Sequence, residues 1–161
     1  MTNPVDKILC PLDTKDVGAA VSLARDLKGY IGGLKIGLEF FTAAGPSGYD
    51  RVAETGMPIF LDLKFHDIPN TVAGAVSSVV PLGPMMLNVH ASGGPAMLQA
   101  AARAAEKAAA EIGIARPKVL GVTVLTSLEE ADLAATGVSW EPTFRGFTRE
   151  TLPPTRTGRC G

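Results

Sequence analysis

The sequence predicts an α/β fold in which helices cover a parallel sheet. Short apolar runs of strand length alternate with helix-like segments over residues 7–135, and polar residues stand at or near the C-terminal ends of the apolar runs. Parallel neighbours need helical crossovers to connect them, so strict alternation favours a parallel sheet. An open doubly wound sheet and a barrel both satisfy this pattern, and both place active sites at the C-terminal strand ends. No GxGxxG motif follows the first strand, so the dinucleotide-binding form of the open sheet lacks its main support.

The first strand and helix are expected near the N-terminus. Residues 7–13 (KILCPLD) form a short apolar run, and Thr14 is placed to cap a following helix. Apolar residues then recur at helical spacing: Val17, Ala20, Val21 and Ala24. The second strand is predicted at 32–40 (GGLKIGLEF), and a helix-like stretch follows at 49–55.

The third and fourth strands are predicted at 57–65 (MPIFLDLKF) and 84–91 (PMMLNVHA). Between them, Pro69 suits the first turn of a helix because its missing N–H would have no helical partner there. The apolar residues of this helix are Val72, Ala75, Val76 and Val79.

The longest predicted helix spans 95–113 and is rich in alanine, the strongest helix former. Gly113 at its end suits a left-handed cap. The fifth strand is expected at 118–127 (KVLGVTVLTS), with a short helix over 128–135.

Length and composition indicate a globular protein with one ordinary domain. The 161 residues are 46% hydrophobic and 19% charged, and the net charge is -1. This balance has no basic excess for binding nucleic acid, and no apolar stretch is long enough for a membrane span. The N-terminus lacks a secretory signal pattern, so we expect a cytoplasmic protein. Cys10 and Cys160 have neither metal-ligand spacing nor the placement of a disulfide framework.

The composition changes after Trp140. Residues 141–161 contain four Arg, three Pro, five Thr and three Gly but no Lys, whereas the preceding 140 residues contain four Arg and seven Lys. The tail has a period of neither 2 nor 3.6 residues. We therefore expect a folded part at 1–140 and an irregular or disordered tail at 141–161.

The chemistry concentrates in residues 60–72 (FLDLKFHDIPNTV). Strand alternation puts Asp62 and Lys64 on one face, and Asp67 follows, which predicts an ammonium between two carboxylates. Lys35 and Asp13, at the ends of the preceding strands, can extend the network. A structural salt-bridge cluster is the alternative to a catalytic site. The cost of desolvating charged groups usually offsets their mutual attraction, so a cluster of five ionisable groups at one end of a sheet adds little stability. A catalytic site is therefore the favoured interpretation.

Two histidines raise the question of a metal site. His66 is adjacent to Asp67, and neighbouring strand positions face opposite sides, so the pair is a poor chelate. His90 is better explained as a packing and hydrogen-bonding residue at a strand end. We expect no metal. The glycines of residues 91–95 (ASGGP) suit either a phosphate-binding loop or a tight turn before a helix.

Several stretches together resemble a known enzyme family. The run FLDLKFHDIPNTV, with CPLD upstream, LKIGLEFF at the second strand and VTVLTSL at the fifth, is similar to bacterial-type orotidine 5'-phosphate decarboxylase over residues 5–140. The resemblance implies a TIM-type (β/α)8 barrel, a homodimer, and conversion of orotidine 5'-monophosphate to UMP in pyrimidine biosynthesis without metal or organic cofactor. A complete barrel has about 250 residues, so about five βα units, a partial barrel, are expected here.

The resemblance also implies roles for the charged residues. Lys64 would deliver a proton to C6 of the pyrimidine as the carboxylate departs. Asp62 and Lys35 would be its charged neighbours and contact the ribose. Asp13 would bind the ribose or the nearby network.

Other residues of the motif are implied in sharing the site between subunits. Asp67, with Ile68 and Thr71, would belong to a loop that crosses into the partner's active site, and Thr126 would line the pyrimidine pocket.

Two alternatives stay open. One is the magnesium-dependent 3-keto-gulonate 6-phosphate decarboxylase, which shares the D-x-K-x-x-D signature, although the HDIPNT run argues against it. The other is a non-catalytic fragment that pairs with other chains.

Overall fold

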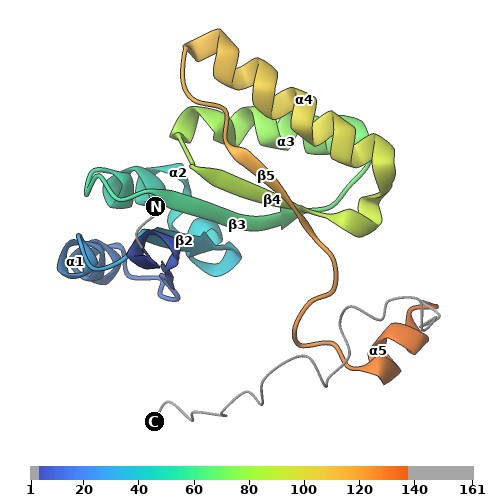
Figure 1. Cartoon of the computed structure of the whole chain (residues 1–161), viewed down its shortest axis with the longest axis horizontal. Helices are drawn as coiled ribbons and strands as arrows, with labels where there is room; N and C mark the ends of the chain where they lie inside the picture. Colours follow the sequence, from blue (N-terminus) through green and yellow to red (C-terminus); the bar gives the residue numbers. More distant parts are fainter. Residues whose placement is uncertain (1–3, 138–161) are drawn as a thin grey trace. The chain divides into compact units, whose positions relative to one another are not determined.

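The computed structural model describes residues 4–137, which divide into two compact units at the boundary between Thr123 and Val124. The predicted change at residue 140 and the irregular tail at 141–161 lie outside the described residues. The first unit contains a sheet with its helices, and the second contains one short helix (Figure 1).

Strands and helices alternate along the first unit as predicted (Figure 1). The elements are β1 (Leu9–Pro11), α1 (Val17–Leu27), β2 (Gly33–Gly37), α2 (Leu38–Ala53), β3 (Ile59–Phe65), α3 (Pro69–Val79), β4 (Met86–His90), α4 (Gly94–Ile112) and β5 (Lys118–Val122), followed in the second unit by α5 (Glu130–Ala135). Short 3-10 turns occupy Pro4–Lys7, Val80–Leu82 and Ala91–Gly93.

The sheet has five parallel strands in the order β1-β2-β3-β4-β5. A doubly wound sheet reverses its strand order at a switch point, whereas a (β/α)8 barrel adds each new strand beside the last. The unbroken sequential order therefore agrees with a partial barrel. In the described part of the chain, β1 and β5 each pair with one neighbouring strand.

The second helix begins much earlier than predicted. Residues 38–40 were expected to continue the strand, but Gly37 instead precedes the first turn of α2, and Phe40 is buried on that helix. The apolar run alone does not separate a strand end from a buried helix turn. A Gly45-Pro46 break lies inside α2, where Gly45 has a φ of 62°. The break interrupts the helical period, so the first half of the helix was not predicted from the sequence.

Two further local predictions were wrong. Asp16 rather than Thr14 caps α1, because its Oδ1 accepts the backbone N–H of Ala19 at 3.0 Å, whereas the Thr14 hydroxyl accepts the N–H of Asp16. The fifth strand ends at Val122, five residues earlier than expected. The left-handed cap at Gly113 is confirmed, with a φ of 71°.

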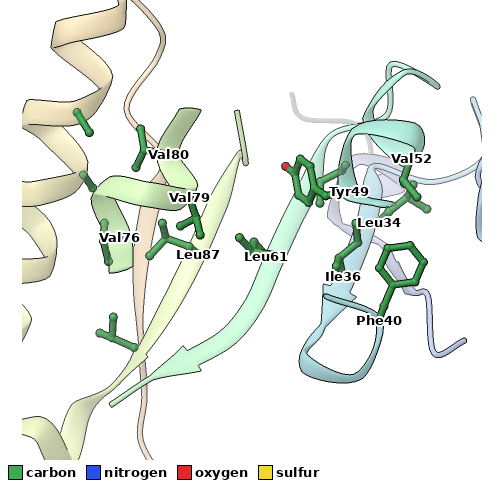
Figure 2. Close-up of a cluster of buried hydrophobic side chains, with 14 of the residues drawn as sticks. Leu34, Ile36, Phe40, Tyr49, Val52, Leu61, Val76, Val79, Val80 and Leu87 are labelled. Carbon is green, nitrogen blue, oxygen red and sulfur yellow. The ribbon is translucent and has the colours of Figure 1, made fainter. Parts of the chain in front are cut away.

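The core lies between the sheet and its helices (Figure 2). Alternate strand residues point into it, and Figure 2 shows Leu61 and Leu87 near α3 and Ile36 near α2. These side chains are fully buried, and burying a leucine or isoleucine contributes about 1.5–3 kcal/mol. The intervening strand positions, which carry Lys35, Asp62 and Asn88, consequently point to the opposite face of the sheet.

The alanine-rich helix α4 packs closely against α3. Its buried residues are mostly alanines at helical spacing: Ala101, Ala104, Ala105, Ala108 and Ala109. Neither α4 nor any other helix within residues 4–137 is long and apolar enough to cross a membrane.

Candidate active site

Asp62 is the centre of a charged cluster on the face of the sheet opposite the helices. It lies in β3 and is 8% exposed. Its Oδ1 accepts hydrogen bonds of 2.6 Å from both the Lys64 ammonium and the Asn88 amide. Its Oδ2 lies 3.3 Å from Nζ of Lys35, which is on β2. One carboxylate on a central strand thus binds cationic or amide donors from its own strand and from both neighbouring strands.

Lys64 reaches Asp62 through an irregularity in β3. The register with β4 shifts between Leu61 and Phe65, and Lys64 has a φ of 52° in the left-handed region. Lys64 is the one non-glycine residue with a positive φ in residues 4–137. Such a conformation costs about 1–3 kcal/mol and persists where surrounding contacts hold it. Here the Lys64 backbone N–H donates to Oδ1 of Asn88 at 2.8 Å.

Asp13 and Lys35 extend the cluster toward solvent. Nζ of Lys35 lies 3.9 Å from Oδ1 of Asp13, which follows β1. The Asp13 side chain is 72% exposed and that of Lys35 is 27% exposed, so this outer pair is weaker than the inner contacts of Asp62. The structure therefore brings together Asp13, Lys35, Asp62 and Lys64, as the sequence predicted.

The cluster keeps Asp62 ionised. Burial by itself raises the pKa of a carboxyl group, but for Asp62 this effect is outweighed by hydrogen bonds from Lys64 and Asn88 and by the positive charges of Lys64 and Lys35. The net result is an Asp62 pKa below its ordinary value. Asp62 is therefore a fixed negative charge that two ammonium groups face.

Asp67 lies outside this cluster within the single chain. β3 ends at Phe65, and Oδ1 of Asp67 accepts the backbone N–H of Ile68 at 2.6 Å just before α3. Among the described residues, the ammonium of Lys64 pairs with Asp62 and not with Asp67. The prediction of an ammonium between these two carboxylates therefore fails for one chain, because the strand ends before Asp67. Ile68 is 65% exposed and Thr71 is also exposed.

Thr126 belongs to the second compact unit, where it follows β5 and is exposed. Its predicted contact with the pyrimidine stays a prediction.

The two histidines lie beside each other at the ends of β3 and β4. Their ring centroids are 5.2 Å apart and the rings are tilted by 35°. Burial, the neighbouring His66 and the charge of Lys64 lower the pKa of His90. Within residues 4–137, no three His, Cys, Asp or Glu side chains gather as a metal site would require.

The loop that follows His90 forms a 3-10 turn, and α4 begins at Gly94 with a φ of 81°.

Sequence reasoning did not assign a site role to Asn88. Asn88 is 3% exposed and bonds to both Asp62 and the Lys64 backbone. The available signal was an amide in the middle of the apolar run 84–91, because a buried polar side chain needs partners.

Comparison with known proteins assigns the chain to a family. Residues 6–142 match the model described as the orotidine 5'-phosphate decarboxylase / HUMPS family. The chain belongs to this family. The match includes every strand and helix described above and all of the clustered charged residues.

Curated relatives are identical to the chain at about half of the aligned positions. It is 53% identical over 137 residues to orotidine 5'-phosphate decarboxylase of Paramagnetospirillum magneticum, covering 85% of this chain and 57% of the relative. The identity to the Rhodospirillum rubrum enzyme of the same name is 54% over 138 residues, covering 85% and 55%. The chain therefore spans a little over half the length of these relatives.

A solved structure agrees with the fold assignment. Orotidine 5'-phosphate decarboxylase from Lactobacillus acidophilus superposes with a TM-score of 0.68 at 33% identity, covering 81% of this chain and 58% of the other. The five strand-helix units correspond to part of such a barrel, in agreement with the partial barrel predicted from the sequence.

Proposed function

We propose that this chain carries the catalytic charged cluster of an orotidine 5'-monophosphate decarboxylase, which forms UMP and carbon dioxide in pyrimidine biosynthesis. Family membership and the names of the relatives support the reaction. The observation that carries the proposal is the 2.6 Å contact between Nζ of Lys64 and Oδ1 of Asp62 on the open face of the sheet. Such biosynthesis fits the cytoplasmic location that the sequence predicts.

The chemistry requires a cation beside the reacting carbon. When the C6–carboxylate bond breaks, its electron pair stays on C6 as a poorly stabilised vinyl carbanion. An ammonium fixed beside C6 stabilises this charge as it develops and then transfers a proton to it. Lys64 supplies that group, becomes a neutral amine, and regains its proton from solvent before the next turnover.

The other charged residues orient Lys64 and the sugar. The ionised Asp62 holds the Lys64 ammonium in one position, which lowers the cost of organising the site during the reaction. Asp62, Lys35 and Asp13 offer both donors and acceptors, the combination needed to bind ribose hydroxyl groups.

We also propose a homodimer in which the exposed segment 67–71 completes the site of the partner chain. Asp67, Ile68 and Thr71 are all exposed at the start of α3, and Asp67 makes no ion pair with Lys64 of its own chain in the described residues. In a partner's site, the Asp67 carboxylate would approach the carboxylate of the substrate and disfavour its ground state. Thr126 would contact the pyrimidine ring.

The direct test is to incubate the purified chain with orotidine 5'-monophosphate and follow UMP by chromatography. We expect UMP to form at a rate that EDTA does not change, because the residues named above need no metal ion. Decarboxylation of 3-keto-gulonate 6-phosphate that EDTA abolishes would instead favour the magnesium-dependent alternative. The 3-keto sugar phosphate should therefore be assayed in parallel.

A second protein controls for the length of the chain. Residues 1–140 are joined to the remaining C-terminal part of the Rhodospirillum rubrum relative, and the same assay is run. If neither protein forms UMP while both are folded by circular dichroism, the decarboxylase proposal is wrong. The non-catalytic alternative then stands.

A further inference from the structure

We infer that Asn88 is a positioning residue that holds Lys64 in its working geometry from two directions. The inference rests on the proposed function of Lys64 as proton donor. Asn88 does not extend toward the substrate as a charged group. It acts through the backbone of Lys64 and through the carboxylate of Asp62.

The two contacts are made by the two ends of one amide. Oδ1 of Asn88 accepts the backbone N–H of Lys64 at 2.8 Å, and Nδ2 donates to Oδ1 of Asp62 at 2.6 Å. That carboxylate oxygen also accepts the Lys64 ammonium at 2.6 Å. Asn88 therefore fixes Lys64 at its main chain and, through one intervening oxygen, at its side-chain end.

The partners determine which way the amide points. A carboxylate only accepts hydrogen bonds and a backbone N–H only donates, so the amide nitrogen must face Asp62 and the oxygen must face Lys64. Asparagine offers one donor and one acceptor at this reach. Ionised aspartate lacks the donor, leucine lacks both groups, and serine has one oxygen on a shorter side chain in place of two separate polar atoms, which explains a buried amide in an otherwise apolar strand.

The position of Asn88 coincides with the irregularity in β3. The strand register shifts between Leu61 and Phe65, so the Lys64 N–H has an amide side chain as its acceptor in place of a β4 carbonyl. The left-handed conformation at Lys64 turns its backbone within this segment. Without the Asn88 oxygen, a partly buried N–H in a strained conformation would lose its acceptor.

Two substitutions separate the two contacts. Asn88→Asp keeps an acceptor for the Lys64 N–H but presents an oxygen without a proton to Asp62. Asn88→Ala removes both contacts. Leu87→Val is the matched control, because it trims the neighbouring buried residue of β4 and removes no polar group.

NMR of the full labelled chain measures each contact without requiring activity. The carboxyl 13C signal of Asp62, assigned by its loss in Asp62→Asn, reports the pKa of that group. Hydrogen exchange reports the protection of the Lys64 amide. We expect a raised Asp62 pKa in both Asn88 variants, because a donor that favours the charged carboxylate is lost. Lys64 exchange should accelerate about tenfold or more in Asn88→Ala and stay close to wild type in Asn88→Asp.

Turnover gives a third measurement that a purely structural role would not affect. Both Asn88 variants should lower kcat about tenfold or more while KM changes little. In Asn88→Asp, kcat relative to wild type should recover as the solution is acidified, because the introduced carboxyl then carries a proton to donate to Asp62.

An Asp62 pKa and a Lys64 exchange rate that match those of wild type in Asn88→Ala would overturn the inference. If Asn88→Ala does not fold, Asn88→Asp decides alone, since an unchanged Asp62 pKa there would equally overturn it. If neither the wild-type chain nor its chimera with the Rhodospirillum rubrum half forms UMP, the proposed function fails, and the two NMR measurements still decide the role of Asn88.

Discussion

The Lys64 ammonium contacts Oδ1 of Asp62 at 2.6 Å although the two residues are separated by a single position in one strand. In a regular strand both side chains would extend from the same face in parallel. The left-handed backbone of Lys64 and the register shift of β3 accompany the close contact. The strand is thus irregular at Lys64, the residue to which we assign proton transfer. Strained backbone conformations of this kind commonly occur in active sites.

The ionisation of Asp62 predicts how stability depends on pH. Because its pKa in the folded protein lies below the unfolded value of about 3.9, the cluster stabilises the fold above that value, and the contribution is lost as the pH falls through the folded pKa. At neutral pH, Asp62→Asn should lower the free energy of unfolding by about 2 kcal/mol. The difference should shrink in acid.

Urea unfolding at neutral and acidic pH measures this difference. Asp26→Asn, which changes an exposed carboxylate on α1, is the control and should alter stability by no more than about 0.5 kcal/mol. A penalty for Asp62→Asn that stays constant down to the acid limit would contradict the account of the cluster.

A shared active site predicts complementation between two inactive variants. A Lys64→Ala chain and an Asp67→Ala chain should each be inactive alone. A mixed dimer has one site in which both residues are intact, so random refolding of an equal mixture should restore about a quarter of the wild-type sites. Mass spectrometry confirms that mixed dimers form. Mixed dimers without activity would show that Asp67 does not act across the interface.

Because the sheet is open, we expect that adding the C-terminal half of a family barrel to this chain will reduce aggregation and increase kcat. In the described residues β1 and β5 each pair on one side only, and Leu120 on β5 is 40% exposed. Unpaired strand edges promote aggregation, and a barrel removes them by closing. We expect the 161-residue chain to elute broadly from a size-exclusion column and to turn over slowly.

The chimera with the Rhodospirillum rubrum half should elute as a discrete dimer with higher kcat. We expect the added half to supply further contacts with the substrate, and the binding energy of such remote contacts appears in kcat. Equal kcat values and equally sharp elution for the two proteins would show that the later strands are dispensable.

The sequence predicted the strand-helix alternation and most of the charged cluster because both rest on short-range patterns. Asp62 and Lys64 share one strand, and Lys35 occupies the corresponding end of the preceding strand. Parallel pairing then brings strand ends together whatever the details of the helices.

Features that depend on pairing between strands were not predictable in this way. The role of Asn88 depends on the register of β4 against β3, and the positive φ of Lys64 occurs where that register shifts. No local pattern marks a lysine for the left-handed region, which most residues avoid. The start of α2 was missed for a different reason, because the Gly45-Pro46 break interrupts the helical period of the sequence.

The most direct test of the central claim is the effect of Lys64→Ala on decarboxylation and on nucleotide binding, measured in the same preparation. UMP formation gives kcat, and calorimetric titration with UMP gives Kd. Because the ammonium acts on charge that develops in the transition state, kcat should fall by at least about a hundredfold while Kd changes only a few-fold. A kcat within about tenfold of wild type would contradict the assignment of Lys64 as the proton donor.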